Sequence, residues 1–196
     1  MNHKLYELIN AYQVQDEQEK RDRAMMLKLI ALFPDIITRN NDIAHFTASP
    51  WIINRDHTKV LMVYHHIYDS WSWCGGHLDG VNDPFAVALK EGKEESGLAE
   101  LRALKKDPLA LNLLPVHGHF KHNEYIASHL HLNLTYLCEA DDRAPLSIKT
   151  DENSEVKWFS VDEINRIVTE KAMLPVYQKL INKMTAFFVT GEMTKR

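Results

Sequence analysis

The segment that most constrains the fold is residues 75–98, GGHLDGVNDPFAVALKEGKEESGL, where a glycine-rich turn leads into a helix with both ends marked. Asp83 is a favourable N-cap, and Pro84 suits the first helical turn because its missing N–H would have no helical partner there. Gly97 stands where a left-handed residue closes a helix. These signals predict a helix over about residues 84–96.

The inner face of this helix is marked by an apolar stripe of Phe85, Ala88, Leu89 and Gly92. Glycine costs about 1 kcal/mol relative to alanine inside a helix. We therefore expect Gly92 to permit close approach of the helix to a sheet.

The remaining positions carry a carboxylate cluster, in which Glu91, Glu94 and Glu95 are spaced i, i+3, i+4. One helical face can present all three acids. Hard divalent cations prefer converging anionic oxygens, so a metal that handles phosphates is one interpretation. The alternative is a solvated charged face balanced by Lys90 and Lys93. The glycine pair immediately upstream favours the metal.

Composition indicates one domain with an appendage: the chain has 196 residues, 45% hydrophobic and 26% charged. A net charge of −4 argues against binding of a nucleic-acid polymer. The two cysteines are too few for a disulfide scaffold, and no apolar run has membrane-spanning length. We expect a soluble, cytoplasmic protein without a membrane partner.

Apolar residues at helical spacing in residues 3–33, interrupted by polar residues 15–23, predict two helices or one bent helix ended by Pro34. Strands are expected at residues 44–49, 51–53, 59–64, 71–73, 109–119, 126–137 and 156–159. Pro115 places one of them at a sheet edge or splits it. Two further helices are expected at residues 161–167 and 174–188. This order predicts an α/β sandwich with an N-terminal helical extension at residues 1–35 and a main domain at residues 36–196.

Residues 76–98 resemble the Nudix box, written G, five residues, E, seven residues, REUxEExGU, where U is a bulky aliphatic residue. The spacing is kept throughout at Gly76, Glu91, Glu94, Glu95, Gly97 and Leu98. Three positions depart from the pattern: Asn82 replaces the first glutamate, Lys90 replaces arginine and Gly92 replaces the aliphatic residue. The segments TASPWI, SWSWCGGHLDG, HLHLNLTYL and DENSEVKWF also look like those of bacterial Nudix hydrolases.

The resemblance implies a Nudix α/β/α sandwich with a mixed sheet over roughly residues 40–170. It also implies a metal-dependent hydrolase that cleaves a diphosphate linkage in a nucleoside diphosphate derivative or similar small molecule. The ligands of Mg²⁺ or Mn²⁺ would be Glu91, Glu94, Glu95 and the Gly75 carbonyl, and the ion would orient a water for attack on phosphorus.

Lys90 would brace a glutamate in this scheme, although it lacks the planar bidentate contact of arginine. The general base varies within the family. The candidates here are Glu91, Glu94, Asp151, Glu152 and Glu155, with Glu152 the choice from the later loop.

Histidines are numerous, and His117 and His119 share one strand face, as do His129, His131 and Asn133. We interpret His77, His119 and His131 as substrate-binding residues. Zinc ligation by histidine pairs is disfavoured because no cysteine or carboxylate stands at the usual spacing.

Two other functions stay open at this point. Isopentenyl diphosphate isomerase shares the Nudix fold and uses a cysteine in Cys-Gly-His, whereas this chain has Cys74-Gly75-Gly76-His77, with one glycine more. The default for Cys74 is therefore a buried, inert thiol. A non-catalytic diphosphate-binding module is compatible with Asn82 and Lys90. The sequence leaves open the substrate, the number of metal ions and homodimerisation through the N-terminal helices.

Overall fold

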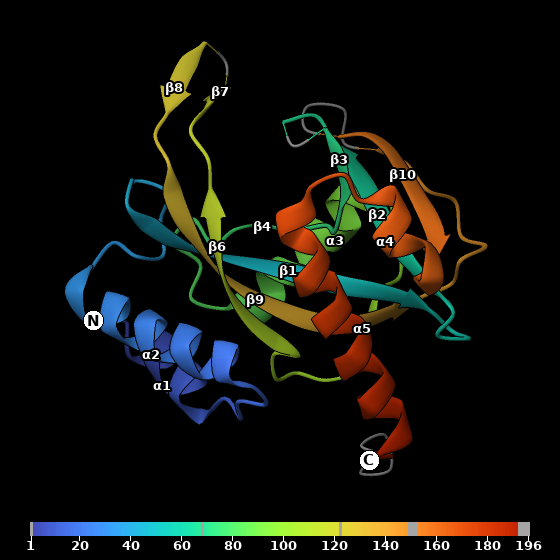
Figure 1. Cartoon of the computed structure of the whole chain (residues 1–196), viewed down its shortest axis with the longest axis horizontal. Coiled ribbons are helices and arrows are strands. Elements are labelled where there is room, and N and C mark those ends of the chain that lie inside the picture. The colour runs from blue at the N-terminus through green and yellow to red at the C-terminus, as the bar shows by residue number, and fades with distance from the viewer. Residues whose placement is uncertain (1, 68, 122, 149–152, 192–196) are drawn as a thin grey trace.

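The computed structural model describes residues 2–67, 69–121, 123–148 and 153–191. Its strands are β1 (Ala44–Asn54), β2 (Lys59–His65), β3 (Ser70–Ser72), β4 (Gly76–His77), β5 (Arg102–Ala103), β6 (Ala110–Val116), β7 (His119–Lys121), β8 (Glu124–Ile126), β9 (His129–Ala140) and β10 (Asn153–Ser160). Within the described ranges, eight strands form one sheet along the path β10–β2–β1–β9–β5, with β3 beside β2, β4 beside β1 and β6 beside β9. The remaining two, β7 and β8, form a hairpin that projects from the sheet (Figure 1).

Helices cover both faces of this sheet. They are α1 (His3–Ala11), α2 (Glu17–Leu32), α3 (Pro84–Ser96), α4 (Ile164–Ile167) and α5 (Leu174–Val189), with short 3₁₀ turns η1 (Val161–Glu163) and η2 (Lys171–Met173). One apolar core joins α1, α2 and α3 to the sheet, and a second joins α4 and α5 to it. The predicted α/β/α sandwich with a mixed sheet and an N-terminal helical part is therefore confirmed. No described helix has the length and apolar character that a membrane span requires.

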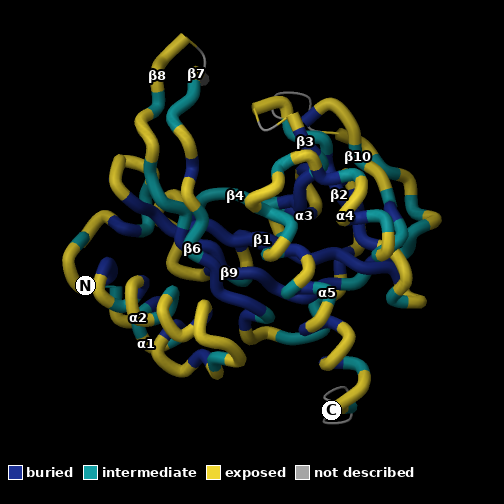
Figure 2. The backbone as a smooth tube through the Cα atoms, viewed as in Figure 1, coloured by how far each residue is buried: buried dark blue, intermediate teal, exposed yellow. Residues whose placement is uncertain are grey.

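The centre of the sheet is β1, which is buried along its whole length and pairs in parallel with β9 (Figure 2). Its side chains alternate between the two cores, since Ile52 lies in the α3 core whereas Trp51 and Ile53 lie in the α5 core. The sequence predicted two separate strands on either side of Pro50, but β1 continues through this residue. Pro50 lies where the partner on one side changes from β4 to β2, so its missing N–H is tolerated.

Two expected strands are divided differently in the structure. Residues 109–119 split into β6 and the start of β7, and Ile126 ends β8 rather than beginning β9. Pro115 lies in β6, which pairs only with β9 among the described strands, so the expected edge position is confirmed.

The bounds predicted for α3 are confirmed. The Asp83 side chain accepts the Ala86 N–H at 3.1 Å, and Gly97 has φ of 72°. At Gly92 a Cβ atom would lie 2.8 Å from both Pro50 Cγ and Leu101 Cδ2. The close approach of α3 to the sheet therefore requires glycine at this position.

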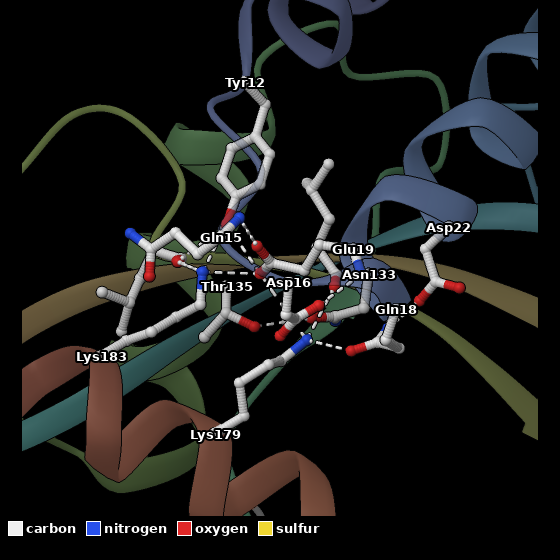
Figure 3. A network of polar contacts seen from close by, with 12 residues as sticks. Tyr12, Gln15, Asp16, Gln18, Glu19, Asp22, Asn133, Thr135, Lys179 and Lys183 are labelled. Atoms are coloured by element: carbon white, nitrogen blue, oxygen red, sulfur yellow. Dashed lines mark hydrogen bonds and ion pairs between the residues drawn. The ribbon is translucent and has the colours of Figure 1, made fainter.

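The two N-terminal helices are joined to α5 by a buried polar network (Figure 3). Glu19 is fully buried and accepts hydrogen bonds from Lys183 Nζ at 2.7 Å and Tyr12 OH at 2.8 Å. Burial and the nearby Glu19 carboxylate raise the pKa of the Tyr12 phenol, which keeps it a hydrogen-bond donor. The Leu109 carbonyl accepts from Lys183 Nζ at 3.1 Å and lies 3.1 Å from Tyr12 OH, so the network also reaches the residue before β6. The helices α1 and α2 are thus packed against the sheet and α5.

Candidate active site

One cavity of about 600 Å³ gathers most of the residues singled out from the sequence. Its wall includes the glycine turn, the acidic face of α3, and the histidines of β1, β4 and β9. The predicted site residues among its lining are Gly75, His77, Lys90, Glu91, Glu94, Glu95, His119 and His131.

The three glutamates of α3 differ in exposure. Glu95 is 3% exposed, whereas the side chain of Glu94 is 42% exposed and that of Glu91 is 14% exposed. All three acids line the same cavity, but Glu95 is buried beneath the glycine turn. Its Oε2 accepts the Gly75 N–H at 2.9 Å, and its Oε1 accepts the Asn153 side-chain amide at 3.3 Å.

Lys90 lies between the other two acids. Its Nζ is 3.4 Å from Glu91 Oε1 and 3.2 Å from Glu94 Oε2. The hydrogen bond to Glu94 and the charge of Glu91 raise the pKa of Lys90, so it stays protonated at neutral pH. Lys90 therefore contacts two of the three carboxylates of α3 at the cavity wall.

Both glycines of the turn are closely packed. A Cβ at Gly75 would lie 2.2 Å from Ser49 Oγ, and a Cβ at Gly76 would lie 2.5 Å from Glu91 Cδ. Gly75 has no room for a side chain because the Ala48 carbonyl oxygen would also lie 3.0 Å from its Cβ, whereas a side chain at Gly76 would displace the Glu91 carboxylate. The glycines bring the turn against the acids.

The histidines form a second group in the same cavity. In the sheet register, His45 of β1 is opposite His131 of β9, and Thr47 of β1 is opposite His77 of β4. Ring centroids of His45 lie 5.0 Å from His77 and 4.9 Å from both His129 and His131. Burial lowers the pKa of His45, and burial together with the neighbouring rings lowers that of His131 well below the usual value.

Sequence reasoning did not single out His45. No local motif marks it, and it joins the other histidines only through the parallel pairing of β1 with β9. His119 also lines the cavity, with its Nδ1 2.9 Å from the carbonyl oxygen of His117.

Two other sequence positions, Glu155 and Asn82, are not part of the cavity lining. Glu155 is exposed on β10 and is not part of the lining, while Asp151 and Glu152 lie outside the described residues. Asn82 is also outside the lining and accepts a hydrogen bond from the Asn2 side chain. Asn82 itself therefore contributes no group to the described cavity lining.

Cys74 is 1% exposed, and its side chain lies in the α3 core rather than in the cavity lining. Burial and the adjacent Glu95 raise the pKa of the thiol well above its usual value. Cys74 is therefore a buried thiol, as the sequence predicted. Because its side chain does not line the cavity, its position does not suit isomerase-like proton transfer to a substrate.

The family model described as NUDIX domain matches residues 45–180, which is more than half of the chain. The chain belongs to the Nudix family. This membership confirms the resemblance seen in the box and the expected enzyme class, a Nudix pyrophosphohydrolase. The two N-terminal helices precede the matched residues.

Solved structures share the Nudix fold at low sequence identity. A binary complex of the Caenorhabditis elegans Ap4A hydrolase is 17% identical, with 74% of this chain and 98% of that chain covered and a TM-score of 0.53. The Escherichia coli dihydroneopterin triphosphate pyrophosphohydrolase is 13% identical, with coverage of 74% and 96% and a TM-score of 0.51. No curated protein matches the chain.

Proposed function

We propose that this Nudix protein is a metal-dependent hydrolase that cleaves the diphosphate linkage of a nucleoside diphosphate derivative or a similar small molecule. The proposal is carried by the placement of Glu91, Glu94 and Glu95 with the glycine turn on the wall of one cavity. A volume of about 600 Å³ suits a small molecule rather than a polymer. The net charge of −4 also disfavours a nucleic-acid polymer.

Mg²⁺ or Mn²⁺ fits this donor set because hard cations prefer carboxylate and carbonyl oxygens. The ligands that we propose are Glu91, Glu94, Glu95 and the Gly75 carbonyl. Both oxygens of Glu95 already accept a hydrogen bond, but each carboxylate oxygen has a second lone pair. When bound, such an ion would neutralise the diphosphate and lower the pKa of an attacking water.

The side chains would divide the remaining work. Lys90 stays protonated between Glu91 and Glu94 and limits their mutual repulsion. Either of these glutamates can accept the proton of the attacking water, and Glu152 stays a candidate base from the later loop. Glu95 holds the glycine turn through the Gly75 N–H.

Substrate contacts are proposed for His77, His119 and His131, which line the same cavity. Neutral imidazoles donate hydrogen bonds to phosphate oxygens without requiring a further charge. Homodimerisation and a cytoplasmic location stay predictions from the sequence.

The test is a panel of nucleoside diphosphate sugars, dinucleoside polyphosphates, NADH, ADP-ribose, CoA and dNTPs, assayed with Mg²⁺ and Mn²⁺. On the best substrate, Glu94→Gln should lower phosphate or monophosphate release by about 10²-fold or more, since it removes a charged ligand. Glu100→Gln, an exposed glutamate just beyond α3, is the matched control and should leave turnover unchanged.

Unchanged turnover in a folded Glu94→Gln variant would refute the proposal. Thermal stabilisation of the wild type by diphosphates, with no turnover under either metal, would instead identify a non-catalytic binding module.

A further inference from the structure

We propose that His45, His77 and His131, with His129 beside them, form a second metal site that takes a transition-metal ion of the zinc class. This site is separate from the glutamates of α3 and differs from them in ligand chemistry. Among the described residues, these three histidines are the group of potential ligands in which one atom from each lies within 4.8 Å of the others.

The sheet holds the ligands on rigid backbone. His77, His45 and His131 occupy the adjacent strands β4, β1 and β9, at or next to the same level of the register. His129 precedes His131 by two residues, so both side chains leave β9 on the same face. Ring centroids separate His77 from His131 by 5.0 Å and His129 from His131 by 5.0 Å.

The spacing of ligand atoms is close to what an ion needs. Zinc binds imidazole nitrogen at about 2.0–2.1 Å, so two nitrogens on a tetrahedral ion lie roughly 3.4 Å apart. The Nε2 atoms of His129 and His131 are already 3.2 Å apart. The ligand atoms of His45, His77 and His131 lie up to 4.8 Å apart. Side-chain rotations can shorten these distances to the roughly 3.4 Å that a tetrahedral ion requires.

The hydrogen bonds of His45 give the strongest argument. Its Nδ1 lies 2.9 Å from the Asn41 carbonyl oxygen, which can only accept, so Nδ1 carries the proton and Nε2 presents its lone pair. His45 is 4% exposed, and its Nε2 is buried without a hydrogen-bond partner in the described structure. Buried polar atoms are normally satisfied, and a metal ion would satisfy this one. A backbone carbonyl behind a ligating histidine is also the usual outer contact of such sites.

His129 repeats this arrangement, because its Nδ1 lies 2.8 Å from the Ala127 carbonyl oxygen. Its Nε2 therefore accepts a hydrogen bond from His131 Nε2–H at 3.2 Å, a proton that must move to the other ring nitrogen of His131 when an ion binds at Nε2. Two imidazoles are thus oriented by carbonyl groups so that Nε2 can bind an ion.

Imidazole ligands select the metal. Nitrogen donors suit Zn²⁺, Cu²⁺, Ni²⁺ and iron, whereas Mg²⁺ requires oxygen. Three histidines that line a cavity leave an open coordination position, as in zinc sites that bind water or substrate. That position would accept a phosphate oxygen of the substrate. This consequence rests on the proposed function, whereas the proposal that the histidines bind a metal ion does not depend on it.

The test is a titration of the chelator-treated full chain with Zn²⁺ or Co²⁺, without substrate and in the presence of excess Mg²⁺. Calorimetry monitors the binding of either ion, and the visible spectrum monitors the binding of Co²⁺. We expect one equivalent per chain and a Co²⁺ absorption typical of nitrogen ligands. His45→Asn and His131→Asn should each weaken affinity by more than about tenfold. His77→Asn, at a partly buried position on the short strand β4, serves the same purpose if the His45→Asn and His131→Asn variants fail to fold.

The controls separate this site from the hydrolase site. His66→Asn, an exposed histidine outside the cluster, and Glu94→Gln should both retain Zn²⁺ binding. Absence of stoichiometric binding by the wild type would overturn the proposal. Wild-type affinity in the folded His77→Asn, His45→Asn and His131→Asn variants would do the same, as would loss of binding in Glu94→Gln alone.

Discussion

Replacement of Glu19 by glutamine would test whether the N-terminal helices are a structural part of this Nudix protein. Glu19 is fully buried and contacts Lys183 Nζ at 2.7 Å, Tyr12 OH at 2.8 Å and the Gln15 N–H at 3.1 Å. Glutamine has nearly the same shape but no charge, and one of its two polar ends can only donate. The Lys183 ammonium would then be buried with only neutral partners.

The size of the effect follows from that uncompensated charge. Removing one partner of a buried ion pair costs about 3–5 kcal/mol, and we expect the lower end because Tyr12 and the Leu109 carbonyl still contact Lys183. A loss of about 3 kcal/mol lowers the urea midpoint by about 1.5 M for a slope near 2 kcal/mol/M. The melting temperature should fall by roughly 6–12 °C for a chain of this size.

Urea denaturation followed by circular dichroism and tryptophan fluorescence measures this change. Glu17→Gln is the matched control: Glu17 lies on the same helix, but its ion pairs with Lys20 and Arg21 are exposed, and it should not shift the midpoint. The double variant Glu19→Gln/Lys183→Met should recover much of the loss because no charge is left buried.

A Glu19→Gln midpoint equal to that of the wild type would refute the reasoning. It would mean that the network contributes no stability and that α1 and α2 are attached only by their apolar contacts.

Three further variants address the cavity. Gly76→Ala should lower kcat/KM by about 10²-fold with an unchanged circular dichroism spectrum, because the added Cβ displaces the Glu91 carboxylate; activity close to wild type would show that this carboxylate is dispensable. Cys74 should resist iodoacetamide in the folded protein at pH 8.5, since its raised pKa keeps the thiolate scarce there, and Cys74→Ala should retain activity. Rapid alkylation or an inactive, folded Cys74→Ala would restore the isomerase alternative. Asn82→Ala should leave turnover within about twofold, because Asn82 contacts Asn2 and does not line the cavity.

The order of elements and the bounds of α3 were predictable because they depend on neighbours in the chain. Asp83, Pro84 and Gly97 determine where α3 begins and ends through their own side chains and backbone angles. The alternation of strand and helix patterns likewise indicated an α/β sandwich, whereas the mixed sheet was implied by the family resemblance. Spacing along α3 was enough to identify the acids and, with the glycine turn, the family.

How far each of the three acids is exposed could be learned only from the tertiary structure. Spacing placed Glu91, Glu94 and Glu95 on one face, but the glycine turn folds over only part of it, so Glu95 is buried and hydrogen-bonded. Pro50 is the opposite case, where a residue that usually interrupts a strand is accommodated because β1 changes partner at that point.

By itself the sequence determined which local elements form, which acids and glycines stand near one another, and to which family the chain belongs, because these depend on spacings of a few residues. Only the tertiary structure decided that His45 meets His131 and that Glu19 meets Lys183. Such contacts depend on which strands pair, in which register, and on which helix covers which face. Burial energy summed over the whole chain selects that arrangement, and no short motif records it.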